Sequence, residues 1–183
     1  MKPIYLSNYI FEKTSTLNHL LNDLEWLQVT EARKEYFMSE KTLEYTYGVG
    51  DFARTYTSKP YSEQINNIQN KLNYDYSCNY NVCFLNRYDT QKHQLGWHAD
   101  DSKEMNFEHP IAVVSFGAER EIWWKKSDQT GLVPKEQRQL LGNGSLFTMP
   151  AGFQKDHLHR IPKCDRSCGI RISLTFRNYL EIK

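Results

Sequence analysis

The sequence lacks the features that mark membrane, secreted or repetitive proteins. No apolar run approaches the ~18 residues of a membrane-spanning helix, and residues 1–13 lack the apolar stretch of a signal peptide. Low-complexity tracts, sustained heptads and repeats of roughly 20 to 50 residues are also absent. We therefore expect a single soluble intracellular domain over residues 1–183. It would act as a monomer in the cytoplasm or, in a eukaryote, in the nucleus.

Cysteine is scarce, and its spacing favours no metal cluster. The four cysteines are Cys78, Cys83, Cys164 and Cys168. Because nothing suggests export, we expect reduced thiols rather than disulfides. Cys164 and Cys168 lie near His157 and His159 in the sequence, but the spacing is poor for a zinc motif.

Net charge is also small, although it is unevenly distributed. The formal charge of +1 favours no class of partner by itself. Residues 1–119 carry 11 Lys+Arg and 16 Asp+Glu, whereas residues 120–183 carry 12 and 6. The basic residues of the second part predict either a phosphate-facing rim or an ordinary solvated surface. They include Lys125, Lys126, Lys135, Arg138, Lys155, Arg160, Lys163 and Arg166.

The hydrophobic pattern predicts two helices followed by a series of short strands. Apolar residues at helical spacing predict helices over 16–28, capped by Ser15 or Thr16, and over 62–73, capped by Ser62. Strands are expected at Val82–Tyr88, Ile111–Phe116, Glu121–Lys126, Ser145–Met149 and Arg171–Arg177. Residues 126–143 are expected to form a loop near the functional site. This order predicts an α+β, mainly β fold, a jelly roll or sandwich with the helices packed on one face.

A histidine and an aspartate two residues apart suggest a metal site. In a strand His98 and Asp100 would point the same way and could approach one ion, although such a pair also arises by chance. A third ligand could be His159, 61 residues after His98, or His157, and spacing alone does not choose between them. Two histidines and one carboxylate, with open coordination positions, fit a mononuclear ferrous site.

Residues 171–177 alternate strictly between polar and apolar side chains. The polar positions are Arg171, Ser173, Thr175 and Arg177. At ~3.3 Å per residue the two arginine Cα atoms stand about 20 Å apart, so the long side chains could hold opposite ends of a small di-acid. An outward-facing strand with solvated arginines is the alternative. Asn86 and Tyr88 share a face of an earlier strand and could bond the same di-acid, which points to an oxygenase using a 2-oxo acid.

In their order these residues resemble the AlkB family of iron- and 2-oxoglutarate-dependent dealkylases. The resemblance covers residues 31–178, beginning with ARKEYFMSEKTLEYTYGVGDFARTYTSKPY. It continues through LNRY, GWHADDS, PIAVVSFGAEREIWW, GSLFTMP, HRIPK and RISLTFR. The pattern looks closest to the branch that repairs alkylated bases in DNA and RNA. It implies a double-stranded β-helix core at 81–178, with residues 31–60 as a substrate-recognition region.

The resemblance also implies roles for individual residues. It assigns iron to His98, Asp100 and His159, because the family's third ligand directly precedes a segment like Arg160-Ile161-Pro162. The 2-oxoglutarate residues would be Asn86, Tyr88, Arg171, Ser173, Thr175 and Arg177, with Ser173 where the family often has Asn. Substrate contacts would be Tyr56, with or without Tyr47, to stack on the base, together with Asp101 for the base and Arg120 for the backbone. The structural alternatives are core aromatics for Tyr56 and Tyr47, a solvated acid for Asp101 and a surface ion pair for Arg120.

The implied reaction is oxidative dealkylation of bases such as 1-methyladenine and 3-methylcytosine. It would use Fe(II), O2 and 2-oxoglutarate and release succinate, carbon dioxide and an aldehyde. The target base would have to be flipped out of a duplex or already single-stranded. Two alternatives remain at this point. One is a hydroxylase or demethylase of a protein or small molecule that uses the same iron site, and the other is a catalytically silent jelly-roll binding module.

Overall fold

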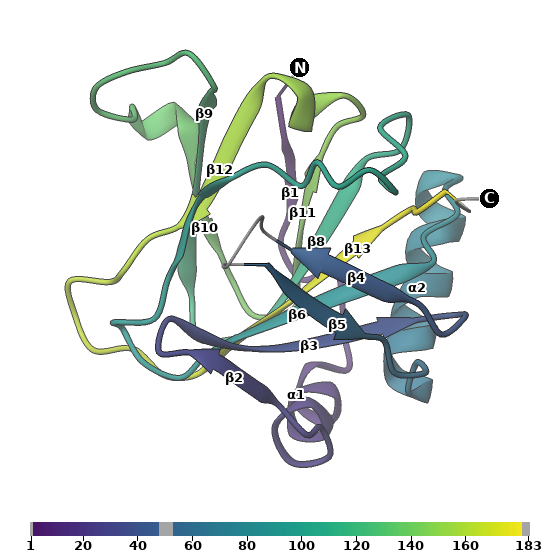
Figure 1. The fold of residues 1–183 in the computed structure, drawn as a ribbon. Helices are drawn as coiled ribbons and strands as arrows, with labels where there is room; N and C mark the ends of the chain where they lie inside the picture. Colours follow the sequence, from purple (N-terminus) through teal and green to yellow (C-terminus); the bar gives the residue numbers. More distant parts are fainter. Residues whose placement is uncertain (1, 48–52, 181–183) are drawn as a thin grey trace.

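The computed structural model describes residues 2–47 and 53–180, which form a sandwich of antiparallel sheets (Figure 1). The larger sheet has seven strands in the order β1 (Ile4–Leu6), β11 (Ser145–Met149), β8 (Ile111–Gly117), β13 (Arg171–Arg177), β6 (Val82–Tyr88), β3 (Arg33–Ser39) and β2 (Leu27–Thr30). The smaller sheet has the order β10 (Arg138–Leu141), β9 (Arg120–Lys126), β12 (His157–Ile161) and β7 (Leu95–His98). A hairpin of β4 (Glu44–Tyr47) and β5 (Arg54–Thr57) forms a third, two-stranded sheet.

Two helices cover the outer face of the larger sheet. They are α1 (Lys13–Asn22) and α2 (Glu63–Tyr76), and Figure 1 shows both on the side away from the four-stranded sheet. Leu20 of α1 and Leu72 of α2 are fully buried against sheet residues such as Leu85 and Leu174. Burying a side chain of this size contributes about 1.5–3 kcal/mol. The mainly β fold with helices on one face is therefore confirmed.

A second apolar cluster fills the space between the sheets. Phe84, Phe147 and Met149 of the larger sheet pack there with Ile122 and Ile161 of the smaller sheet. Along β6 and β13 the side chains alternate between this cluster and the helix-covered face. Polar residues on the inward positions of β13 are thus enclosed between the sheets. Within residues 2–47 and 53–180, neither helix has the length and apolar character that crossing a bilayer requires.

The structure corrects two expected elements near the ends of the fold. The first helix runs over Lys13–Asn22 rather than 16–28, and residues 27–30 form β2, which pairs with β3. The indole N–H of Trp26 donates to the Leu20 carbonyl at 2.8 Å, which satisfies one of the free carbonyls at the end of the helix. The predicted cap is also wrong, because the Thr16 hydroxyl lies inside the helix and donates to the Glu12 carbonyl.

The segment expected as a loop, 126–143, contains a strand. Residues 138–141 form β10, which pairs with β9 from Arg138↔Trp123 to Leu141↔Arg120. A short 3-10 helix at Lys135–Gln137 precedes it. The segment is therefore a long hairpin, and it lies at the edge of the smaller sheet opposite β7 rather than beside the candidate metal residues.

Candidate metal and co-substrate site

Three side chains predicted as metal ligands meet between the two sheets. One ligand atom from each of His98, Asp100 and His159 lies within 4.8 Å of the others. His98 and His159 are opposite each other on β7 and β12, with ring centroids 4.1 Å apart. Asp100 follows the end of β7, and its Oδ2 lies 3.9 Å from His159 Nε2. The cluster is the one the sequence predicts, although Asp100 lies outside the strand that was expected to carry it.

His157 lies on the same strand as His159 but has other partners. Its Nδ1 donates to Asp156 Oδ1 at 2.6 Å, and its ring stacks on Phe153 with centroids 4.2 Å apart. The cluster of possible metal ligands includes His159 and omits His157. The geometry therefore favours His159 over His157 as the third ligand, a choice that spacing left open.

An irregularity in β7 aims His98 at the cluster. Between the pairs His159↔His98 and Ile161↔Leu95, β7 has one more residue than β12. Such a bulge lets Leu95 and His98 both face the interior. Nδ1 of His98 donates to the Gly96 carbonyl at 2.9 Å, which leaves Nε2 free as a ligand.

The protonation states suit a cationic metal. Burial and the neighbouring imidazole of His98 lower the pKa of His159 to about 3, so this ring is neutral at physiological pH. Burial also lowers the pKa of His98. For Asp100, burial acts to raise the pKa, but the charge of Arg177 and the hydrogen bond that it donates lower it overall. The cluster thus presents two neutral imidazoles and one carboxylate, the donor set of a ferrous site with open positions.

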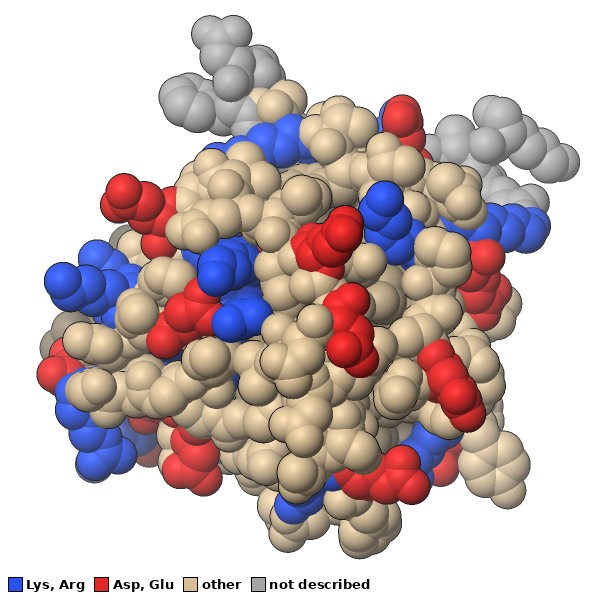
Figure 2. Space-filling model, turned by 90° about the horizontal axis from the view of Figure 1, so that it is seen from below, with Lys and Arg blue, Asp and Glu red and all other residues tan. Residues whose placement is uncertain are grey.

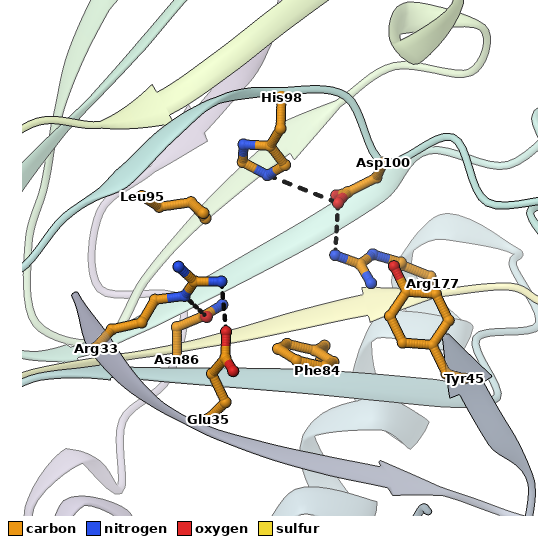
Figure 3. Close-up of a pocket in the computed structure, with 9 residues that line it drawn as sticks. All are labelled: Arg33, Glu35, Tyr45, Phe84, Asn86, Leu95, His98, Asp100 and Arg177. Carbon is orange, nitrogen blue, oxygen red and sulfur yellow. Dashed lines mark hydrogen bonds and ion pairs between the residues drawn. The ribbon is translucent and has the colours of Figure 1, made fainter. Parts of the chain in front are cut away.

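Two polar side chains hold Asp100 in place. Nη2 of Arg177 donates to Asp100 Oδ1 at 2.7 Å, and Gln154 accepts the backbone N–H of Asp100 at 3.0 Å (the Arg177 contact is drawn in Figure 3). Both Arg177 and Gln154 are buried. Oδ2 of Asp100 is also buried and makes no hydrogen bond. An unsatisfied carboxylate oxygen beside two imidazoles is an arrangement that a metal ion completes.

Arg171 lies at the other end of the polar face of β13, and its charge is unpaired. Its side chain is 0% exposed, and Nη2 donates to the neutral Ser115 hydroxyl at 3.0 Å. Nε and Nη1 have no hydrogen-bond partner among the described residues, and the guanidinium lies 5.3 Å from the Tyr88 ring centre. Burial lowers the pKa of Arg171 to about 10, so the group remains charged at neutral pH. A buried guanidinium without an anion fits a ligand carboxylate.

The remaining predicted co-substrate residues line the same interior. Ser173 and Thr175 are buried on β13, and Asn86 pairs with Ser173 across from β6. Arg177 is 6% exposed, which excludes the solvated-arginine alternative for this strand. Asn86 lines the pocket beside His98 and accepts a hydrogen bond from Arg33 Nε at 2.7 Å.

The pocket beside the cluster includes several residues that the sequence reasoning missed. Figure 3 shows Arg33, Glu35, Tyr45, Phe84 and Leu95 around it, together with Asn86, His98, Asp100 and Arg177. Glu35 is 2% exposed, and its carboxylate pairs with Arg33 and accepts the Tyr56 hydroxyl. A charged pair in a strand is usually solvated, and only the contacts made by the fold reveal that this one is buried.

The predicted substrate residues occupy different positions. Tyr56 is buried, and its ring lies nearly parallel to that of Tyr45, with centroids 6.4 Å apart. Tyr45 lines the pocket, whereas Tyr56 supports it through Glu35. Asp101 is exposed immediately after Asp100. Tyr47 ends β4, but its side chain lies outside the part of the chain that is described.

Arg120 is enclosed in the fold instead of facing a substrate. Its side chain is 1% exposed, and Nη2 donates to the carbonyls of His93, at 2.8 Å, and of Pro162. Its guanidinium also lies 5.5 Å from the Tyr88 ring centre. An arginine bound in this way holds the β6–β7 connection against the β12–β13 connection. This structural role replaces both the predicted contact with a nucleic-acid backbone and the alternative of a surface ion pair.

Comparison with known proteins agrees with this geometry. A family model described as the 2OG-Fe(II) oxygenase superfamily matches residues 5–177. The chain belongs to this superfamily. As a 2OG-Fe(II) oxygenase it uses Fe(II), 2-oxoglutarate and O2, which confirms the expected cofactors. The unpaired atoms of Asp100 and Arg171 are consistent with these two groups.

Curated relatives of this oxygenase are AlkB homologues, which confirms the predicted resemblance. The mouse DNA oxidative demethylase ALKBH2 is 30% identical over 155 residues, 82% of this chain and 63% of the relative. The human alpha-ketoglutarate-dependent dioxygenase alkB homolog 3 is 28% identical over 172 residues, 88% of this chain and 59% of the relative. The chain thus spans about 60% of the length of these two relatives. The solved structure of OsALKBH1 has the same fold, with a TM-score of 0.64 at 12% identity over 96% of this chain and 97% of that chain.

Proposed function

We propose that this oxygenase removes N-linked alkyl groups from nucleic-acid bases, as a DNA or RNA repair enzyme. The observation that carries the proposal is the pocket beside the triad, which combines aromatic rings with a buried carboxylate. Tyr45 and Phe84 supply apolar walls, and Glu35, whose carboxylate also pairs with Arg33, supplies a buried acceptor for a cationic base. Bases such as 1-methyladenine and 3-methylcytosine are flat and cationic at neutral pH, so both features favour them. The named activities of the mouse and human relatives point the same way.

The residues of the chain have distinct tasks in this reaction. When bound, Fe(II) and 2-oxoglutarate supply the oxidising chemistry with O2, and the co-substrate leaves as succinate and carbon dioxide. His98, Asp100 and His159 would hold the metal, and Arg171 would bind a carboxylate of 2-oxoglutarate. Arg177 keeps Asp100 ionised and oriented. Hydroxylation of the alkyl carbon attached to nitrogen gives a product that releases an aldehyde and leaves N–H on the repaired base.

Residues 31–60 would form the substrate-recognition part of a single catalytic domain. This region contains β3 with Arg33 and Glu35, and the β4–β5 hairpin with Tyr45 and Tyr56. We place Tyr45 nearest the base and Tyr56 behind it, with Asp101 available at the exposed side. Because the target atom must reach the buried triad, the base would enter flipped or from a single strand. The enzyme would act as a monomer in the cytoplasm or nucleus.

The test is turnover on defined lesions. Protein loaded with Fe(II) is incubated with 2-oxoglutarate and single-stranded oligonucleotides that carry one 1-methyladenine or 3-methylcytosine. We expect loss of the methyl group by mass spectrometry, together with formaldehyde and stoichiometric succinate. Reactions without 2-oxoglutarate, and the His159→Ala variant, should give none of these products.

Glu35→Gln separates base recognition from oxidation. It keeps the size of the side chain but removes the charge, so we expect a higher KM for the cationic lesion and little change in the 2-oxoglutarate KM. If the wild-type enzyme leaves all alkylated oligonucleotides intact while succinate still forms slowly, the nucleic-acid proposal fails. A protein or small-molecule substrate would then be the better assignment.

A further inference from the structure

Two tryptophans and three cations alternate across the smaller sheet. Cζ of Arg138 lies 4.1 Å from the ring centre of Trp123, and Cζ of Arg160 lies 5.2 Å from the same ring. Arg160 also lies 5.4 Å from the ring centre of Trp97, and Nζ of Lys125 lies 5.2 Å from it. We refer to these five residues as the indole–cation ladder.

The ladder is on the face of the sheet that points away from the metal site. On β12, Arg160 alternates with His159 and Ile161, which are buried between the sheets. On β9, Trp123 follows Ile122, which packs in the same interior. Every ladder residue keeps part of its surface exposed. The ladder is therefore separate from the pocket and accessible from solvent.

The cations of the ladder have no acidic partners. Among the described residues, Lys125, Arg138 and Arg160 form no ion pair. The carboxylate on the same face of β9, Glu121, instead accepts the indole N–H of Trp123 at 2.6 Å. Nε of Arg160 has no hydrogen-bond partner. The ladder thus offers positive charge and flat rings together, with most of that charge uncompensated.

A groove beside the ladder carries further charged side chains of both signs. Its lining includes Trp123, Arg160, Lys163 and Arg166, as well as the acids Glu119, Glu121 and Asp165. Figure 2 shows Lys and Arg side chains gathered on the left of the view, with some acids among them. Figure 1 places the smaller sheet on that same side. Of the 12 basic residues in 120–183, Lys125, Arg138, Arg160, Lys163 and Arg166 belong to the ladder or line this groove.

Trp97 links the ladder to the pocket. It directly precedes the ligand His98 in β7, which is the edge strand in the order β10-β9-β12-β7. A chain that leaves the pocket over this edge would meet Trp97 first and then cross β12, β9 and β10. At about 4.8 Å per strand the path across the sheet is roughly 14 Å long.

We propose that the indole–cation ladder is a docking surface for the single-stranded nucleic acid that flanks the target base. This inference rests on the proposed function and adds a second contact region outside the pocket. Flat aromatic faces bind bases of any sequence, while neighbouring cations bind phosphates, which is the combination used by single-strand binding proteins. The ladder would increase affinity for long substrates without touching the reacting base.

The test compares long and short substrates in the Fe(II)- and 2-oxoglutarate-loaded enzyme. The variant R138Q/R160Q removes two ladder charges, and K59Q/K71Q removes two charges outside the smaller sheet. Binding of a fluorescent single-stranded 20-mer is measured over a range of salt concentrations. Turnover is measured on a trinucleotide and on a 20-mer that carry the same 3-methylcytosine. Thermal melting shows whether each variant is folded.

We expect R138Q/R160Q to weaken 20-mer binding at least tenfold and to reduce the slope of log Kd against log salt by about 1.4, while trinucleotide turnover is unchanged. R138K/R160K should keep the slope but bind less tightly than wild type, because lysine stacks poorly on indole. Wild-type 20-mer binding by R138Q/R160Q, or an equal loss in K59Q/K71Q, would overturn the inference. If no lesion is repaired but the 20-mer still binds through the ladder, the proposed function fails and the docking surface stands.

Discussion

Arg171 and Arg177 share one face of β13, but the fold neutralises only one of them. Arg177 donates to Asp100, so its charge is used to hold a metal ligand. The facing carboxylate raises the pKa of Arg177, although burial alone would lower it. Arg171 donates only to the neutral Ser115 hydroxyl. An isolated buried cation is unfavourable, so the site is most stable when an external carboxylate binds there.

Replacement of Arg171 should therefore affect 2-oxoglutarate above all. Hydrogen bonds to a charged group are worth about 1.5–3 kcal/mol each, so Arg171→Met should raise the 2-oxoglutarate KM by roughly 10- to 100-fold. Succinate formation at saturating oligonucleotide measures this. Ser115→Ala, which removes only a neutral acceptor, is the matched control and should change the KM far less. An unchanged KM in Arg171→Met would place the co-substrate elsewhere.

The two histidines of β12 give a direct test of the metal assignment. His159→Ala removes a ligand, so Fe(II) affinity should fall by more than about 100-fold, the upper range for residues that only support ligands. His157→Ala removes a ring that stacks on Phe153 and should leave metal affinity within a few-fold of wild type. Anaerobic titration with Fe(II), measured by isothermal calorimetry, distinguishes the two variants. Equal losses would show that both histidines matter to the ion.

Sequence reasoning identified the residues whose placement depends on local geometry. The alternation in 171–177 predicted a polar face because side chains in a strand alternate whatever the rest of the fold does. Arg33 and Glu35 gave no such signal. Glu35 is buried and Arg33 is partly buried, because Arg33 reaches Asn86, 53 residues away, and Glu35 accepts the Tyr56 hydroxyl. Pairings over such distances are absent from any short window of sequence.

At the scale of elements, the predicted strands were more accurate than the first helix. Five strands were predicted within one residue of their observed bounds, because each is a short apolar or alternating run flanked by turn residues. The helix over 16–28 was predicted too long because Leu24 and Leu27 continue the helical spacing. In the structure residues 27–30 pair with β3 instead, so tertiary pairing overrides the local pattern.

The end of β8 contains a glycine on which the position of Arg171 depends. Gly117 has φ +83°, pairs with Arg171, and leaves only 2.3 Å between an added Cβ and the Ile170 carbonyl oxygen. Gly117→Ala should therefore destabilise the protein by about 1–3 kcal/mol and raise the 2-oxoglutarate KM. Chemical denaturation and turnover measure the two effects.

Gly131 provides a control for that substitution. It has a similar φ of +80°, but nothing lies within 4 Å of an added Cβ. Gly131→Ala should thus show the cost of the backbone conformation alone, without the collision and with no change in KM. If the two variants are equally stable and equally active, the close contact at Gly117 has no effect on the site.

For the whole molecule, both cofactors would bind inside a scaffold built from long-range strand pairings. The mainly β character and the helix-covered face were predictable from patterning, because each depends on which residues are apolar. The participation of β1 and β2 at the two edges of the large sheet was not, because β1 pairs with β11 far along the chain and β2 lies where apolar spacing predicted a helix. The triad itself depends on the pairing of β7 with β12, which places His98 opposite His159.

Binding of both cofactors should raise thermal stability measurably. At concentrations 100-fold above Kd a ligand adds about 2.7 kcal/mol, which corresponds to roughly 5–10 °C in a protein of this size. Mn(II), which does not support turnover, together with 2-oxoglutarate should produce such a shift in Tm. Absence of a shift in the wild-type protein would contradict a metal and co-substrate site in this fold.

The position of β13 at the centre of the seven-stranded sheet has a consequence for amide hydrogen exchange. β13 is paired on both sides, by β8 and β6, whereas β7 is an edge strand with one neighbour. Local opening begins at edges and reaches central strands last. Backbone amides near Arg171 and Arg177 would thus exchange at the slow rate of global unfolding, while those near His98 exchange by local fraying. The co-substrate-binding residues of β13 would stay in place during local fluctuations of β7 that release the metal.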